Sequence, residues 1–195
     1  MSYSNFNQVF DQFSSLKVLI IGDVMVDAYI WGAVERISPE APVPIVRSTK
    51  QDYRLGGAAN VALNIQALGA EPVLCAVVGK DDGANKVFDR LLANNIADTG
   101  IVVSDERPTT VKTRIMSGHQ HIVRSDEETD RLVSTTEEAS LIKKIEELIS
   151  SCDVVICEDY DKGVISKKLI ERAVQLAKEE GSQTGVDPKK RNFLN

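Results

Sequence analysis

Continuous apolar runs alternate with amphipathic stretches along this chain of 195 residues. Runs at residues 17–22, 72–78 and 153–157 contain few polar side chains, which is typical of parallel strands that are buried on both faces. Shorter apolar runs at 101–103 and 184–186 predict two further strands. The pattern therefore predicts a central sheet of parallel strands.

Helices are predicted between these strands, because apolar residues recur there at intervals of three and four. The segment 58–68 places its apolar residues on one face and is followed by Gly69, a residue common at helix ends. Other helices are predicted over 6–13, over 84–94, after the capping box at 134–137, and from Ser166 to Gly181. Alternating strands and helices are typical of an α/β fold with helices on both faces of the sheet.

Two regions, about 28–48 and 109–124, break this alternation. Polar and apolar residues alternate singly in both, as in the run Val-Lys-Thr-Arg-Ile at 111–115, and this period of two predicts strands exposed on one face. We interpret the two regions as a small β lid that projects from the main sheet. We also expect the chain to form a homodimer through this lid, and association through an exposed edge and apolar face of the main sheet stays open as an alternative.

Composition narrows the class of protein. A hydrophobic content of 43% with 27% charged residues is ordinary for a globular domain. The net charge of −6 argues against a nucleic-acid partner, which would require a basic surface. No apolar run approaches the roughly 20 residues of a membrane span, and the first residues lack the pattern of a signal peptide, so we expect no membrane partner and a cytoplasmic protein.

Metal chemistry is not expected from the sequence. The three cysteines, Cys75, Cys152 and Cys157, form no C-x-x-C pair, and each lies in or beside an apolar run, so we interpret them as structural thiols. His119 and His121 have no cysteine or carboxylate at a spacing typical of metal ligands.

Candidate site residues gather where the predicted strands end, which is where open α/β sheets bind ligands. Gly56 and Gly57 precede a helix, so the backbone there can approach a ligand closely and present free N–H groups. Further polar residues follow the other strands: Asp23, Asp27, Asn60, Glu158, Asp159, Lys162, Asp187 and Lys189. For Asp23, capping of a turn is an equally good interpretation.

These residue types suit a phosphorylated sugar. The carboxylate of Asp27 and the amide of Asn60 can bind vicinal hydroxyls, while Lys162 and Lys189 can neutralise phosphate oxygens. Arginines at 114 and 124 in the lid can hold a second anion, because the guanidinium fork matches phosphate geometry. Neither G-x-x-x-x-G-K-[ST] nor G-x-G-x-x-G occurs, which disfavours a P-loop NTPase and a Rossmann dehydrogenase.

Several segments resemble the PfkB, or ribokinase-like, carbohydrate kinases, and the likeness spans nearly the whole chain. The segments are GDVMVD at 22–27, RISPEAPVP at 36–44, GGAANVA at 56–62 with the glycine at 79, DYDKG at 159–163 and DPK at 187–189. The proline-rich segment is similar to the branch of the family that phosphorylates heptose 7-phosphate. The resemblance implies a ribokinase-like fold, a mostly parallel sheet with flanking helices and a small β lid.

The resemblance also implies an activity and a set of roles. The enzyme would transfer the γ-phosphoryl group of ATP to the anomeric hydroxyl of D-glycero-β-D-manno-heptose 7-phosphate, with Mg²⁺, in the synthesis of the lipopolysaccharide core. Residues that would hold the sugar phosphate are Asp27, Gly56, Gly57, Asn60, Arg114, Gln120, Arg124 and Asp159. Residues that would border the phosphate and nucleotide side are Lys162, Asp187 and Lys189.

The N-x-x-E and G-A-G-D segments of the family do not occur in this chain. In the family they supply a glutamate linked to magnesium, the anion hole and the general base. The chain is therefore expected to be the N-terminal portion of a PfkB-type domain, to contain no catalytic residue, and to show little or no kinase activity alone. Two alternatives stay open: a non-catalytic module that binds sugar phosphate or dimerises, and a related kinase for fructose phosphate or a nucleoside.

Overall fold

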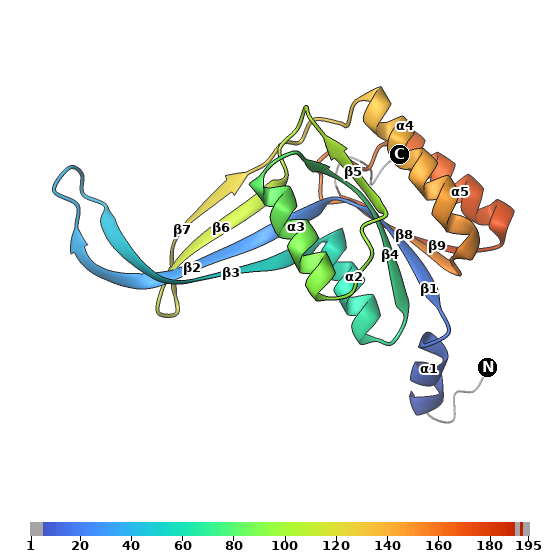
Figure 1. Ribbon diagram of the computed structural model, residues 1–195, viewed down its shortest axis with the longest axis horizontal. Helices are drawn as coiled ribbons and strands as arrows, with labels where there is room; N and C mark the ends of the chain where they lie inside the picture. Colours follow the sequence, from blue (N-terminus) through green and yellow to red (C-terminus); the bar gives the residue numbers. More distant parts are fainter. Residues whose placement is uncertain (1–5, 190–191, 193–195) are drawn as a thin grey trace.

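Two β-sheets form the framework of the protein (Figure 1). The structure is a computed structural model that describes residues 6–189 and 192. The larger sheet has five parallel strands in the order β5-β4-β1-β8-β9. Their bounds are β1 Lys17–Gly22, β4 Glu71–Gly79, β5 Gly100–Ser104, β8 Val154–Glu158 and β9 Gln183–Asp187.

Helices cover both faces of this main sheet (Figure 1). One face carries α2 (Ala58–Ala67) and α3 (Asp82–Ala93), and the other carries α4 (Thr135–Leu148) and α5 (Lys167–Glu180). The helix α1 (Phe6–Phe13) precedes β1, and a short 3-10 helix (Ile149–Ser151) follows α4. Within the described ranges, none of these helices has the length and apolar character that a membrane span requires.

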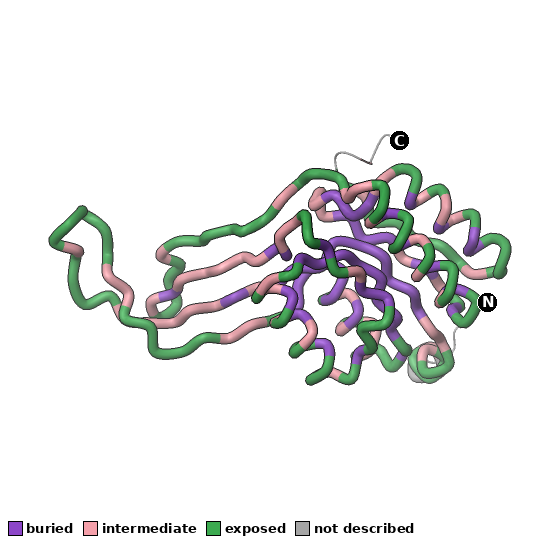
Figure 2. Tube along the Cα trace, turned by 45° about the horizontal axis from the view of Figure 1, so that its top comes forward, coloured by how far each residue is buried: buried purple, intermediate pink, exposed green. Residues whose placement is uncertain are grey.

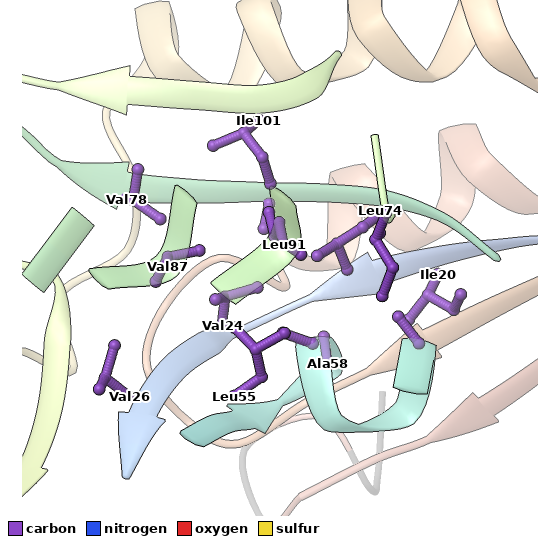
Figure 3. Close-up of a cluster of buried hydrophobic side chains, with 14 of the residues drawn as sticks. Ile20, Val24, Val26, Leu55, Ala58, Leu74, Val78, Val87, Leu91 and Ile101 are labelled. Atoms are coloured by element: carbon purple, nitrogen blue, oxygen red, sulfur yellow. The ribbon is translucent and has the colours of Figure 1, made fainter. Parts of the chain in front are cut away.

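Side chains of the central strands alternate between two buried clusters, which explains why the strands are continuous apolar runs. Ile20 points into the cluster beneath α2 and α3, which Figure 3 shows, whereas Leu19 and Ile21 point into the cluster beneath α4 and α5. The first cluster continues into the base of the lid through Val26 and Leu55 (Figure 3). The lid is therefore anchored in the hydrophobic core.

The second sheet forms the lid, with four strands in the order β3-β2-β6-β7. Its strands are β2 Val24–Ile37, β3 Pro44–Gly57, β6 Thr110–Ser117 and β7 Gln120–Glu127. Asp23 alone separates β1 from β2, so the lid directly continues the middle strand of the main sheet. Figure 2 shows that buried positions concentrate in the main sheet, while the outer lid is exposed.

The predicted α/β fold with a mostly parallel sheet and flanking helices is confirmed. The lid segments expected at 28–48 and 109–124 fall within the lid sheet, but its strands are longer, since β3 runs to Gly57 and β7 to Glu127. Asp27 was expected between the end of the first strand and the start of the lid, and it lies within β2. The apolar residues at 24–26 are buried at the base of the lid, which hides the alternation there.

Candidate functional site

Gly56 and Gly57 allow three backbone segments to meet at the base of the lid. Gly57 has a φ of 58°, and a Cβ there would lie 2.2 Å from the carbonyl oxygen of Asp23. A Cβ on Gly56 would lie 2.7 Å from a carboxylate oxygen of Asp27. Because a glycine tolerates this φ and this proximity, β3 can end against β2 and leave room for the carboxylate.

Asp27 and Arg114 form an ion pair on one face of the lid. The register places Asp27 opposite Lys112, and Arg114 follows two residues later on the same face of β6. Nη1 of Arg114 donates to Oδ1 of Asp27 at 2.5 Å. The two side chains are 24% and 19% exposed, so the pair is held in a fixed position and is still accessible to a ligand.

A pocket of about 460 Å³ lies beside this ion pair. Its polar lining comes from the lid, α2 and the end of α3: Asp27, Asp52, Arg54, Asn60, Arg90 and Asn94. The ring of Tyr29 and the side chains of Leu55 and Leu63 contribute further surface. A concave site of this size with convergent carboxylate, amide and guanidinium groups suits a small polyol that carries a negative charge.

Sequence reasoning found Asp27 and Asn60 of this pocket but missed several lining residues. Tyr29, Asp52 and Arg54 lie on the same lid face as Asp27, two residues apart along each strand. This alternation was the signal in the sequence that could have found them. Arg90 and Asn94 were assigned to a helix without a role in binding.

Asp23 is a buried carboxylate that holds the loop after β8. It accepts hydrogen bonds from the backbone N–H groups of Tyr160, Lys162 and Val164 at 2.8, 3.1 and 3.0 Å. Burial raises the pKa of Asp23, and these hydrogen bonds only partly oppose that effect. Its contacts therefore match the turn-capping interpretation.

Asp159, which was expected to face the substrate, is only 1% exposed. Its carboxylate accepts hydrogen bonds from the backbone N–H groups of Asp161 and Lys189 and from the side-chain amide of Asn192. The residue thus ties the loop after β8 to the segment after β9. It does not line the pocket beside Asp27.

Lys162 reaches the lid through an ion-pair network. Its Nζ donates to Oε1 of Glu128 at 2.8 Å, and Lys112 donates to Oε2 of the same carboxylate at 2.7 Å. The hydrogen bonds from Lys112 and Lys162 hold the pKa of Glu128 below its ordinary value. Burial alone would lower the pKa of Lys112, but its bonds to Glu128 and Asp126 outweigh burial and raise it. The network links the outer lid strands to the main sheet.

Arg124 and Gln120 lie further out on β7. Arg124 pairs in register with Arg114, is 55% exposed and contacts Asp126 through Nε at 2.9 Å. Gln120 pairs with Ser117, five residues along β6 from the partner of Asp27. At about 3.3 Å per residue this is about 17 Å, so the structure does not bring Gln120 to Asp27.

Asp187 and Lys189 lie at the end of β9, apart from the pocket residues. Their side chains are 57% and 45% exposed, and Nζ of Lys189 is 3.9 Å from Oδ2 of Asp187. The buried Glu158 pairs in register with Asp187, and its pKa is raised, mainly by burial and further by the charge of Asp187. Of the residues expected at these strand ends, Asp187 and Lys189 lie on an open surface, whereas Glu158 is buried.

The fold and the site define a class of protein. Residues 15–182 match the pfkB family of carbohydrate kinases, and the chain belongs to this family. It is similar to the bifunctional protein HldE of Azorhizobium caulinodans, with 47% identity over 177 residues, 90% of this chain and 37% of that protein. The bifunctional protein HldE of Caulobacter vibrioides is 43% identical over 181 residues, 93% of this chain and 37% of that protein. The chain thus spans a little over a third of the length of these relatives.

Solved structures support the fold. A carbohydrate kinase from Agrobacterium tumefaciens has a TM-score of 0.63 at 17% identity, with 88% of this chain and 53% of that chain covered. The ribokinase of Arabidopsis thaliana, solved in complex with ribose and ATP, has a TM-score of 0.59 at 12% identity, with 89% and 53% covered. At these identities the likeness shows the ribokinase-like fold alone.

Proposed function

We propose that this chain forms the acceptor-binding part of a cytoplasmic kinase for D-glycero-β-D-manno-heptose 7-phosphate. The pocket beside Asp27 carries the proposal, because it brings hydroxyl-binding and anion-binding groups together at the base of the lid. Membership in the pfkB family supports a carbohydrate acceptor. The similarity to proteins named HldE supports the heptose branch that the sequence resembles.

In this proposal the residues of the chain bind and orient the acceptor. The carboxylate of Asp27 accepts hydrogen bonds from adjacent sugar hydroxyls, and its ion pair with Arg114 fixes its direction. The side-chain amide of Asn60, exposed in the first turn of α2, donates to and accepts from the same sugar. The glycines at 56 and 57 leave the space that the ring needs at the end of β3.

ATP would supply the transferred phosphoryl group, with Mg²⁺ as its counterion. The described residues fit only the border of such a site, since Asp187 and Lys189 lie on an open strand end. In the described ranges no three side chains of His, Cys, Asp or Glu come together as metal ligands. We therefore assign binding and orientation of the acceptor to this chain, and no step of the transfer itself.

Phosphoryl transfer by the natural protein that contains these residues tests the proposal. The assay compares heptose 7-phosphate, a fructose phosphate and a nucleoside as acceptors with ATP. We expect heptose 7-phosphate to give the highest kcat/KM, and the chain of 195 residues alone to bind this sugar with little or no turnover. A preference for the nucleoside or the fructose phosphate would overturn the assignment.

We also propose that two copies of the chain associate through the lid. The supporting observation is that large apolar side chains are exposed on it, with Ile37 at 59%, Val43 at 52% and Val123 at 52%. Light scattering coupled to gel filtration should give the mass of a dimer. A Val123→Glu variant should elute as a monomer, and a dimer that persists in this variant would refute the lid as the interface.

A further inference from the structure

The loop that joins β8 to α5, residues 159–166, contacts the roots of three lid strands, meaning the segments just before β2, just before β6 and after β7. Asp23, directly before β2, holds this β8–α5 loop through three backbone N–H groups. Arg107, in the segment before β6, donates through Nη2 to the carbonyl oxygen of Lys162. The β8–α5 loop is therefore hydrogen-bonded to the roots of both β2 and β6.

The root of β7 packs against the same loop. The N–H of Val133 donates to the carbonyl oxygen of Gly163 at 3.0 Å. Nζ of Lys162 donates to Oε1 of Glu128, the residue after β7, at 2.8 Å. Gly163 has a φ of 85°, and a Cβ there would clash with the carbonyl oxygen of Arg131. Because a glycine tolerates this φ and this close approach, the segment that leaves β7 can lie directly on the β8–α5 loop.

The other side of the β8–α5 loop is bonded to the segment after β9. The carboxylate of Asp159 accepts hydrogen bonds from the backbone N–H of Lys189 at 3.2 Å and from the side-chain amide of Asn192 at 2.8 Å. Nζ of Lys189 also lies 5.3 Å from the ring centre of Tyr160, a distance typical of a cation–π contact. The end of β9, which is expected to border the phosphate and nucleotide side, thus shares one loop with the lid.

Two buried carboxylates fix the shape of this loop. Asp23 and Asp159 are each 1% exposed, and they accept hydrogen bonds from N–H groups that alternate along the loop. Asp161 has a φ of 57°, which a non-glycine residue rarely adopts. Its Oδ1 atom is buried and has no hydrogen-bond partner within the described part of the chain. The contacts around the loop therefore impose this conformation and hold the loop as one unit.

We propose that the β8–α5 loop couples the end of β9 to the lid, and that Asp159 is the positioning residue of this coupling. A phosphate chain that binds at the end of β9 moves the segment after β9, and Asp159 passes this movement through the loop to the roots of β6 and β7. The acceptor and the phosphate donor bind with positive cooperativity, because both favour the same position of the lid. The identities of the two ligands rest on the proposed function, whereas the coupling within the chain does not.

Hydrogen–deuterium exchange of the chain of 195 residues tests the coupling without any ligand. Asp159→Asn keeps the shape of the side chain but leaves one acceptor oxygen in place of two. We expect the backbone amides of residues 110–113 in β6 and 125–127 in β7 to exchange at least about tenfold faster in this variant, and those of β1 and β4 to exchange as in the wild type. Faster exchange confined to the loop and β9, or spread evenly over the chain, would show a merely structural role and overturn the inference.

Asp153→Asn is the matched control for this experiment. Asp153 lies just before the opposite end of β8, and its carboxylate also accepts a backbone N–H, that of Lys17 at 2.8 Å. The control should leave exchange in the lid unchanged. Lid exchange that rises equally in Asp153→Asn and Asp159→Asn would contradict a specific role of Asp159.

The path through the loop is tested with Arg107→Met, which removes the hydrogen bond to the carbonyl oxygen of Lys162. In this background Asp159→Asn should accelerate lid exchange less than it does in the wild type, because both substitutions interrupt the same path. Fully additive effects of the two substitutions would refute a path through the β8–α5 loop.

Calorimetry on the natural protein that contains these residues adds the two ligands. Heptose 7-phosphate is titrated with and without a non-hydrolysable ATP analogue and Mg²⁺. We expect the analogue to tighten sugar binding about fivefold or more in the wild type and less than about twofold in Asp159→Asn. A wild type that binds the sugar without this effect, or an equal effect in the variant, overturns the inference. If lid exchange responds as expected but heptose 7-phosphate does not bind to the wild type, the coupling stands and the proposed acceptor is wrong.

Discussion

Replacing Gly57 with alanine is expected to destabilise the protein much more than the same change at Gly118. Both glycines have a left-handed φ, 58° and 57° respectively. A positive φ costs an L-residue about 1 kcal/mol in the left-handed helical region, and it costs more at Gly57, whose ψ of −138° lies outside that region. At Gly118 no atom lies within 4 Å of the added Cβ, and the total loss should stay at about 1 kcal/mol.

The added Cβ at Gly57 would lie 2.2 Å from the carbonyl oxygen of Asp23. This oxygen also accepts the N–H of Ala58 at 3.0 Å, so the start of α2 and the base of β2 must move apart. Overpacking of this kind typically costs a further 1–3 kcal/mol or so, which gives a total of about 2–4 kcal/mol or more.

Urea denaturation followed by circular dichroism measures the loss of free energy of unfolding in both variants. The fluorescence of Trp31 reports on unfolding of the lid in the same samples. We expect the free energy of unfolding of Gly57→Ala to fall at least about 1 kcal/mol below that of Gly118→Ala. Equal free energies of unfolding for the two variants would show that the close approach at the end of β3 is not required.

Three further predictions concern stability and reactivity. Asp23→Ala leaves one buried and two partly buried backbone N–H groups without their acceptor and should cost about 2 kcal/mol or more in urea denaturation; a loss below about 1 kcal/mol would contradict this role. Because the pKa of Glu128 is lowered in the folded state, its ion pairs stabilise the protein above the ordinary pKa of 4.5 and lose this effect as the pH falls through the lowered pKa. Glu128→Gln should therefore reduce the free energy of unfolding at neutral pH and match the wild type in strong acid, and a difference that grows on acidification would refute the reasoning. Burial raises the pKa of Cys75 and Cys157 to about 12, so neither thiol should react with a disulfide reagent at pH 8 until the protein unfolds, and rapid labelling of the native chain would contradict this.

The main sheet could be predicted because each strand is buried on both faces. Val18 and Ile20 of β1 meet one helix layer while Leu19 and Ile21 meet the other, so the strand appears in the sequence as an uninterrupted apolar run. The lid could be predicted from its period of two, which marks one exposed face. The base of the lid could not be predicted in this way, because both faces of its strands are buried there.

The candidate site could be predicted in part, for a reason that concerns strand register. Gly57 and Asn60 lie at the start of a helix, so their place at the end of β3 and in the first turn of α2 follows from local sequence. Arg54 meets Tyr29 only because β3 pairs with β2 in one particular register, and a shift of one residue would turn its side chain to the other face. The sequence also does not show that Asp159 is enclosed by its own loop.

Calorimetric titration of the chain with heptose 7-phosphate, before and after Asp27→Ala, tests the proposed acceptor site most directly. Glu35→Ala is the matched control, because it removes another carboxylate of β2 that is ion-paired to an arginine at 2.5 Å, but one outside the pocket. We predict that the wild type and Glu35→Ala bind the sugar phosphate, and that Asp27→Ala, although folded, gives no measurable heat of binding. An Asp27→Ala variant that binds heptose 7-phosphate with the affinity of the wild type would contradict the account.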